Sequence, residues 1–144
     1  HNPAVIPTLV GIARGVTADL VIGSRWVRGG RVNGWSVARQ TISRAGNSYA
    51  RLALRSKIND MTAGFRVIRV AKLRQLHLET IASSGYCFQI EIADRVEADG
   101  GTIIEHPITF IERASGTSKM HPGIVVEAFV RITGWGVGRW FLGR

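Results

Sequence analysis

The stretch HPITFIERASGTSK, residues 106–119, begins with the pattern of a strand and continues as a loop suited to an anion. Apolar and polar side chains alternate up to Phe110, as in a β-strand. The loop that follows carries Arg113, hydroxyl side chains, a glycine and Lys119. A guanidinium fork and an ammonium group beside exposed backbone N–H groups can hold an oxyanion. A solvated basic loop after a strand is the alternative, and this stretch alone leaves both open.

The composition and charge of the chain limit the classes of protein to which it can belong. The chain has 144 residues, of which 45% are hydrophobic, and a mean hydropathy of +0.09, which suits one globular domain with a core. Its net charge of +9, from 19 Lys and Arg against 10 Asp and Glu, favours anionic partners such as nucleic acid, anionic lipid or phosphorylated substrates. The single cysteine, Cys87, excludes an internal disulfide and is expected to be buried. No stretch has the roughly 18 uncharged apolar residues that a membrane span requires.

Strand and helix patterns alternate along the chain, which predicts an α/β fold. The expected helices cover residues 3–13, 37–54, 71–81, 86–98 and 122–133, and the expected strands cover residues 19–22, 65–70 and 102–110. Ser36 has the chemistry of an N-cap for the second helix. Residues 26–36 are expected to form a loop. Glycines at 134, 136 and 138 are expected to end the last helix.

Cationic and hydroxyl side chains follow the first strand and open the second helix. Ser24 and Arg25 stand at the carboxyl end of a buried strand, where open α/β sheets bind ligands. Arg39 and Ser43 are four residues apart and share a helix face. A cation such as Arg39 in a first helical turn is disfavoured by the helix dipole, and a bound anion would offset that cost. Arg25, Arg39 and Ser43 are therefore candidate anion ligands, whereas other arginines of this helix are expected to face solvent.

Four blocks in order resemble one enzyme family. They are ADLVIGSR (18–25), DMTAGFR (60–66), SGYCFQIE (84–91) and the pattern P-I-T-F-x-E-R-x-x-G-x-S-K-M (107–120). These blocks are similar to those of the polyprenol (dolichol) phosphate mannosyltransferases, inverting family 2 glycosyltransferases of the GT-A fold. The resemblance runs from His1 to about Gly134, and four ordered blocks make it specific.

The resemblance implies a GT-A-like (Rossmann-like) mixed sheet flanked by helices. Residues 1–133 are then expected to be the acceptor-side, C-terminal part of the domain without the nucleotide-binding half, and residues 134–144 a Gly/Trp/Arg-rich interfacial tail. In that family an Asp-x-Asp metal motif precedes a Ser/His-x-Pro segment, and His1-Asn2-Pro3 resembles the end of that segment. The ligands of a divalent metal, Mg²⁺ or Mn²⁺, are accordingly expected outside this chain, and no metal ligands are assigned within it.

The implied reaction moves mannose from GDP-mannose to a polyprenyl phosphate with inversion, and this chain alone is expected to be inactive. Carried over by motif, the catalytic residues are Arg25, Asp60 and Arg113. The residues expected to bind the lipid phosphate are Ser24, Arg25, Arg39, Ser43, Arg113 and Lys119. Gln89 and Glu91 are secondary candidates, since the helix that carries them borders the acceptor site in related enzymes.

The prenyl tail of the acceptor implies that the enzyme acts at the cytoplasmic face of a membrane and binds peripherally to its anionic surface. The expected interfacial anchor comprises aromatic and aliphatic residues beside arginines: Phe129, Trp135, Trp140, Phe141, Leu142, Arg131, Arg139 and Arg144. Alternatively these aromatics close a core, or a separate membrane-spanning partner supplies the docking. A polyprenyl-phosphate glucosyltransferase and a non-catalytic lipid-phosphate or membrane-binding module remain alternatives. Nucleic acid is not expected as a partner, because the arginines form no basic helix stripe.

Overall fold

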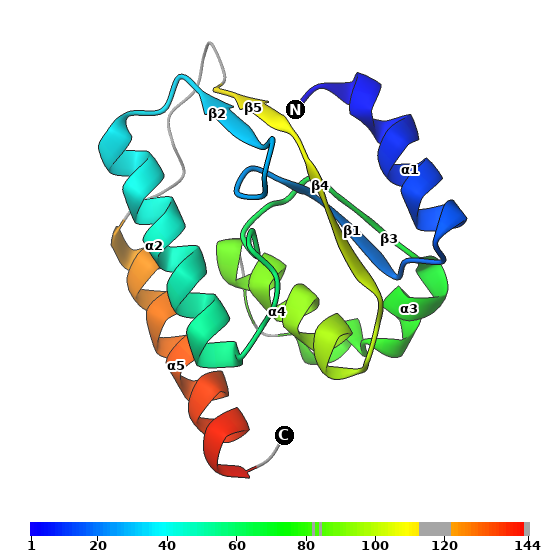
Figure 1. The fold of residues 1–144 in the computed structure, drawn as a ribbon. Coiled ribbons are helices and arrows are strands. Elements are labelled where there is room, and N and C mark those ends of the chain that lie inside the picture. The colour runs from blue at the N-terminus through cyan, green and yellow to red at the C-terminus, as the bar shows by residue number, and fades with distance from the viewer. Residues whose placement is uncertain (82, 84, 113–121, 143–144) are drawn as a thin grey trace.

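A central mixed sheet with helices on both faces organises the chain (Figure 1). The computed structural model describes residues 1–81, 83, 85–112 and 122–142. Strand β1 (Leu20–Ser24) lies between β3 (Arg66–Ile68), which is antiparallel to it, and β4 (Ile103–Pro107), which is parallel. All five residues of β1 are buried, as expected for a strand covered on both faces. The predicted mixed α/β architecture is confirmed.

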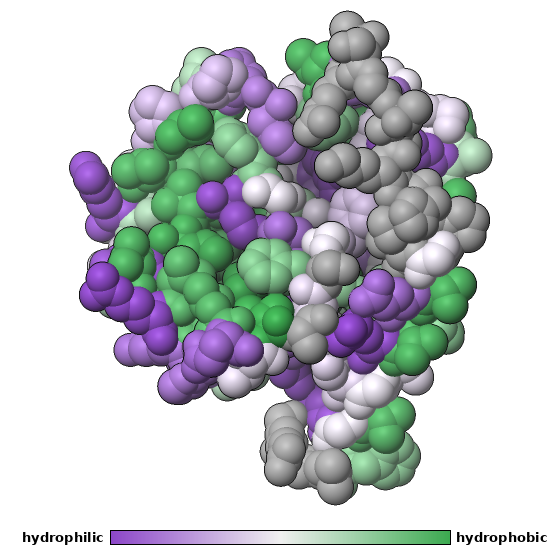
Figure 2. Space-filling view, turned by 180° about the vertical axis from the view of Figure 1, so that it is seen from behind, coloured by the Kyte–Doolittle hydropathy of each residue, from purple (hydrophilic) through white to green (hydrophobic). Residues whose placement is uncertain are grey.

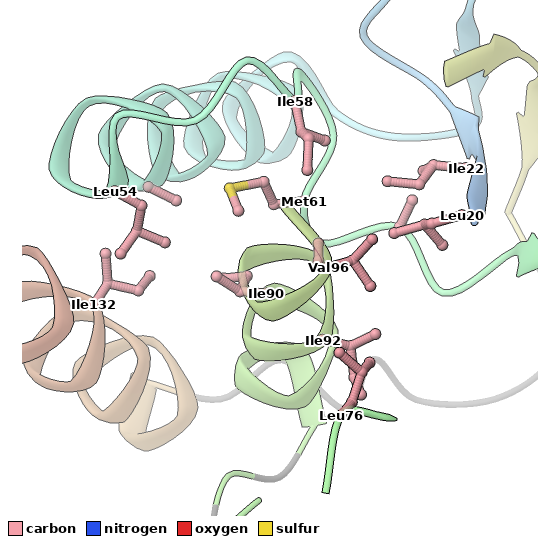
Figure 3. Close-up of a cluster of buried hydrophobic side chains, with 13 residues drawn as sticks. Leu20, Ile22, Leu54, Ile58, Met61, Leu76, Ile90, Ile92, Val96 and Ile132 are labelled. Atoms are coloured by element: carbon pink, nitrogen blue, oxygen red, sulfur yellow. The ribbon is translucent and has the colours of Figure 1, made fainter. Parts of the chain in front are cut away.

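The two faces of β1 meet different helices. Val21 packs with Leu9 of α1 (Ile6–Gly15), which follows a short 3₁₀ turn at Pro3–Val5. Leu20 and Ile22 point to the opposite face and join the main core with α2 (Val37–Leu54), α4 (Gly85–Ala98) and α5 (Pro122–Leu142). Figure 3 shows this cluster converging from the sheet and the three helices. Seen from the side opposite to Figure 1, the molecule presents a broad apolar area edged by hydrophilic side chains (Figure 2).

The expected strand at residues 102–110 is divided into two strands in different sheets. The chain leaves β4 at Pro107 and enters β5 (Thr109–Ile111), which pairs in parallel with β2 (Arg31–Asn33). Ile108 connects the two sheets: its N–H donates to Ser24 O (3.0 Å), and its carbonyl accepts from Arg31 N (2.9 Å). Strand β2 lies where a continuous loop was expected, so that prediction was wrong.

The predictions for α2 and α4 are confirmed, and the helix expected at 71–81 is shorter. Ser36 Oγ accepts the N–H of Arg39 (3.3 Å), so the predicted N-cap of α2 is present. In place of a helix at 71–81, α3 (Val70–Gln75) is followed by a 3₁₀ turn at Leu78–Thr80. His77 between them has a φ of 48°, a left-handed conformation that interrupts the helix.

Helix α5 continues through the glycines that were expected to end it, so that prediction was wrong. It lies beside α2 (Figure 1), and a Cβ on Gly136 would come within 2.9 Å of Ala53 O in α2. The missing side chain therefore allows a close helix–helix contact. Beyond it, Trp140 Nε1 donates to Ala53 O (3.1 Å) and Arg139 Nη1 to Leu54 O (2.6 Å). These contacts at the carbonyl end of α2 hold the last turns of α5 in place.

Candidate functional site

A cavity of about 360 Å³ opens among α2, α4 and α5 beside the carboxyl end of β1. Arg25, Ser43 and Thr62 form its polar end, because Arg25 Nη2 donates to Thr62 Oγ1 (2.9 Å), and Asn47 Nδ2 donates both to Thr62 Oγ1 (3.2 Å) and to Ser43 O (2.9 Å). The remaining lining is apolar, aromatic or small: Trp35, Ile42, Ala45, Gly46, Tyr49, Tyr86, Ile90, Ala128, Phe129 and Ile132. The cavity is therefore amphipathic, with one cation in a largely apolar lining.

Arg25 is held at the polar end by Asp60. Its Nε lies 2.8 Å from Asp60 Oδ2 and its Nη2 lies 2.7 Å from Oδ1, a bidentate pair in which Asp60 is fully buried. Arg25 also donates its backbone N–H to Oδ2 (2.9 Å) and Nη2 to Thr62 Oγ1 (2.9 Å). Within the described residues, its Nη1 makes no hydrogen bond. The guanidinium is thus rigidly oriented and keeps one nitrogen for a ligand.

The turn that carries Asp60 is braced from two sides. Glu105 on β4 accepts from Asn59 N (2.7 Å), Asn59 Nδ2 (2.8 Å) and Asp60 N (2.9 Å). Arg66 donates to Met61 O (3.2 Å) and to Gln89 O (3.0 Å) in α4. Burial lowers the pKa of Arg66 to about 10, against the opposing effect of Asp60, so it remains a cation near neutral pH. These hydrogen bonds therefore fix the position of the turn and of the Asp60 carboxylate that binds Arg25.

Arg39 and Arg25 both lie against the ring of Trp35. The Cζ atom of Arg39 is 4.1 Å from the ring centroid and that of Arg25 is 5.3 Å from it. Arg39 is ion-paired with Glu112 at the end of β5. Ser43 lines the cavity one turn further along α2, and its hydroxyl donates no hydrogen bond within the described chain. The structure thus brings Arg25, Arg39, Ser43 and Asp60 into one region, although Arg39 is not part of the cavity lining.

The other predicted site residues lie elsewhere. Ser24 is fully buried, and its hydroxyl accepts from Trp26 N (3.3 Å). Glu91 is buried and accepts from Ser83 Oγ and from Arg95 Nη2 (2.6 Å), away from the cavity. Gln89 is half-buried and does not line the cavity either. Arg113 and Lys119 lie outside the described residues. The roles of these residues stay predictions.

Sequence reasoning did not single out Trp35, Thr62 and Tyr49 as parts of the site. Thr62 belongs to the quoted block 60–66, so its place beside Asp60 could have indicated it. Trp35 was one of several Trp and Arg residues in a presumed loop, with no signal that it would lie between two arginines. Tyr49 occupies an ordinary apolar helix position and lines the cavity, with its hydroxyl 2.6 Å from Thr133 Oγ1 of α5.

The described residues contain neither a group of metal ligands nor a membrane-spanning helix. Across residues 1–81, 83, 85–112 and 122–142, no group of three or more His, Cys, Asp or Glu side chains could hold a metal ion. The divalent metal that the resemblance implies therefore has no ligand set in this part of the chain. None of the helices, over the same residues, is long and apolar enough to cross a membrane.

Comparisons with known proteins agree with the resemblance. No protein-family model matches the chain. The chain is 47% identical over 141 residues to an undecaprenyl-phosphate mannosyltransferase of Micrococcus luteus, covering 97% of the chain and 57% of that enzyme. It is 42% identical over 137 residues to a polyprenol monophosphomannose synthase of Mycolicibacterium smegmatis, covering 95% of the chain and 51% of that enzyme. The chain thus spans about half the length of these curated relatives. The predicted resemblance is confirmed, and nearly all of the chain is homologous to part of the bacterial polyprenyl-phosphate mannosyltransferases.

Proposed function

We propose that this chain forms the acceptor-binding part of a GT-A glycosyltransferase that moves mannose from GDP-mannose to a polyprenyl phosphate with inversion. The observation that carries the proposal is the amphipathic cavity, with Arg25, Ser43 and Thr62 at its polar end. A polyprenyl phosphate has the same asymmetry, an anionic head on a long apolar tail. The relatives' names support mannose as the sugar and polyprenyl phosphate as the acceptor.

The polar end is suited to hold the attacking phosphate. A phosphate monoester is anionic near neutral pH, so its oxygen can attack the anomeric carbon without a strong general base. The protein mainly has to orient this anion and reduce its repulsion from the diphosphate of the donor. Arg25 offers its unoccupied Nη1 and Ser43 its hydroxyl, while Arg39 lies on the neighbouring Trp35 ring. By resemblance, Arg113 and Lys119 would add further positive charge.

The apolar part of the cavity is suited to the first units of the prenyl tail. Side chains of α2, α4 and α5 form its walls, and Tyr49 stacks on Phe129 with ring centroids 4.7 Å apart. Transfer of prenyl carbons from water into such a lining is favourable by roughly 25 cal/mol per Å² of buried apolar surface. The apolar lining therefore supports a prenyl phosphate as the ligand rather than a small soluble phosphate ester.

The outer surfaces of α2 and α5 support peripheral docking on the cytoplasmic face of a membrane. Exposed apolar side chains are numerous on both helices: Val37, Ile42, Leu52, Val126, Phe129, Val130, Val137, Trp140 and Phe141. Three residues of the expected anchor, Phe129, Trp140 and Phe141, are among them. Trp135 instead packs against the main core, and Arg139 is paired with Asp94 and caps α2. The side chain of Leu142 and residue Arg144 lie outside the described part.

Vesicle binding tests the docking. The complete protein containing this sequence is expected to co-sediment with anionic liposomes, and less so at high salt, because interfacial binding combines apolar insertion with charge attraction. Phe141, the most exposed of these side chains at 83%, provides the variant Phe141→Ser, which should weaken binding. Absence of vesicle binding at low salt would assign docking to a separate partner.

Transfer kinetics test the acceptor site. Arg39→Ala and Ser43→Ala should each raise KM for polyprenyl phosphate, by roughly tenfold or more for the arginine, because a charge-assisted hydrogen bond contributes about 1.5–3 kcal/mol. Arg74→Ala on α3, exposed and distant in the fold, is the matched control. Arg51 is less suitable as a control, since it donates to Asn59 beside Asp60. Equal losses in all variants would indicate bulk charge and refute a site.

The assay also separates the alternative functions. Transfer from UDP-glucose but not from GDP-mannose would identify a glucosyltransferase on the same scaffold. Acceptor-dependent vesicle binding with no transfer from either donor would identify a non-catalytic module that binds a lipid phosphate.

A further inference from the structure

Glu112 connects the end of β5 to the first turn of α2, and neither the proposed reaction nor the resemblance gives it a role. Its carboxylate pairs with Nη1 of Arg39, and its backbone N–H donates to Asn33 O (3.1 Å). Its Cβ also packs tightly on the turn before α2: a Cβ on Gly34, whose φ is +91°, would lie 3.0 Å from Glu112 Cβ. The carboxylate is therefore anchored on the same turn that begins the helix carrying Arg39.

The Arg39 guanidinium is fixed by two contacts of different kinds. It lies over the Trp35 ring, with Cζ 4.1 Å from the centroid, which sets the plane of the group. Glu112 then holds Nη1, which sets the rotation of the group within that plane. Nε is buried without a partner, and Nη2 makes no hydrogen bond within the described residues. Nη2, which is not buried, is therefore the atom left for an oxygen of a ligand.

Stability does not account for this arrangement. The side chains of the pair are 25% and 40% exposed, and ion pairs of that exposure contribute little to folding. The pair does offset a local cost, because Arg39 stands in the first turn of α2, where the helix dipole disfavours a cation. A long arginine side chain in solvent would otherwise occupy many rotamers, and ordering it would weaken its binding of a ligand.

We propose that Glu112 is a positioning residue for the acceptor phosphate: it holds Arg39 so that Nη2 is preorganised for a phosphate oxygen. The proposal rests on the proposed function and adds to it a residue that does not itself touch the substrate. The carboxylate stays on Nη1 when the phosphate binds, so the guanidinium bridges Glu112 and the phosphate.

A double-mutant cycle tests the proposal in the complete protein, with a short-chain polyprenyl phosphate as the acceptor in detergent. Glu112→Gln keeps the shape of the side chain and removes its charge. It is expected to raise KM for the acceptor about three- to tenfold with a smaller change in kcat, because the lost order weakens a contact made in binding. In an Arg39→Ala background the same substitution should change KM less than about twofold, since the group that it positions is absent.

The controls exclude general effects of charge and folding. Glu79→Gln, an exposed carboxylate of the 3₁₀ turn at Leu78–Thr80, should leave KM unchanged. Thermal unfolding of Glu112→Gln should stay close to that of the parent protein, because the pair is partly exposed to solvent. A KM increase without loss of stability therefore reports on positioning.

Four results would overturn the proposal. A lower KM in Glu112→Gln would show that the carboxylate competes with the phosphate for Arg39. An equal KM increase with and without Arg39 would show that Glu112 acts through another group. An unchanged KM in Arg39→Ala would overturn the proposed phosphate site and this inference together, whereas a raised KM in Arg39→Ala with an unchanged KM in Glu112→Gln would overturn this inference alone.

Discussion

Replacement of Asp60 by Asn should destabilise this domain far more than the small change in side-chain volume suggests. The Asp60 carboxylate is fully buried and accepts three hydrogen bonds from Arg25, at 2.9, 2.8 and 2.7 Å, with Thr62 Oγ1 at 3.3 Å. Asparagine keeps the size of the side chain but loses its charge, and its amide N–H₂ would face the N–H groups of Arg25. The 7% exposed Arg25 would then lack a countercharge.

The magnitude follows from the burial of both partners. Removal of one partner of a buried ion pair typically costs about 3–5 kcal/mol, because the other charge remains desolvated. Single domains have unfolding free energies of roughly 5–15 kcal/mol in total. The expected loss is therefore a large share of the stability of this domain. With an m-value of about 2 kcal/mol/M, the urea midpoint should fall by roughly 1.5–2.5 M.

Urea unfolding followed by tryptophan fluorescence measures this loss. Glu127→Gln is the control, because the Glu127–Arg131 pair on α5 has side chains 39% and 34% exposed and should contribute under about 1 kcal/mol. The double variant Asp60→Leu with Arg25→Met should recover much of the stability, since a buried pair can be replaced by apolar packing. If Asp60→Asn lowers the unfolding free energy by less than about 1 kcal/mol, the pair is solvated in solution and the reasoning fails.

Two further predictions concern the packing of α5. Gly136→Val should lower the unfolding free energy by about 1–3 kcal/mol, because its side chain would overlap the Ala53 carbonyl in α2. Gly138 has open space around it, so Gly138→Ala should raise the unfolding free energy by up to about 1 kcal/mol. Urea unfolding of the two variants measures both changes. Burial raises the pKa of Asp94 from its ordinary 3.8 to about 6, with Arg139 opposing the shift, so the folded state holds this proton more tightly than the unfolded state. The contribution of Asp94 to the unfolding free energy should therefore rise by up to about 3 kcal/mol as pH falls from about 6 to 4. The difference between parent and Asp94→Asn in urea titrations across this range should show that rise, and a constant difference would contradict it.

The parts of the fold that sequence reasoning reached are those with local causes. Ser36 caps α2 through its own hydroxyl, three residues from the N–H that it accepts, so side-chain chemistry and periodicity sufficed there. The buried run of β1 is likewise visible, because a strand covered on both faces is apolar throughout. The closeness of Arg25 and Asp60, 35 residues apart, has no local signal. That pairing follows from the path of the chain between β1 and β3.

The errors share one cause, which is a tertiary contact that outweighs local preference. Strand β2 is only three residues long and lies among glycines; it pairs with β5 because Ile108 brings the second half of the chain beside it. The glycines of α5 disfavour a helix locally, yet Gly136 is required where the helix approaches Ala53. In both places the deciding partner is distant in the sequence, so periodicity could not reveal it.

The electrostatics of the site also differ from what a count of arginines suggests. Arg25 and Arg39 both lie against the Trp35 ring, and each has a carboxylate partner, Asp60 and Glu112 respectively. These four groups sum to no net charge, so they cannot attract a phosphate by net charge. In the proposed phosphate site their contribution would come from the direction of the N–H groups, since each guanidinium is held by a carboxylate on one side. In the proposed site the carboxylates would therefore not cancel phosphate binding by the arginines, because they would fix the direction of the N–H groups.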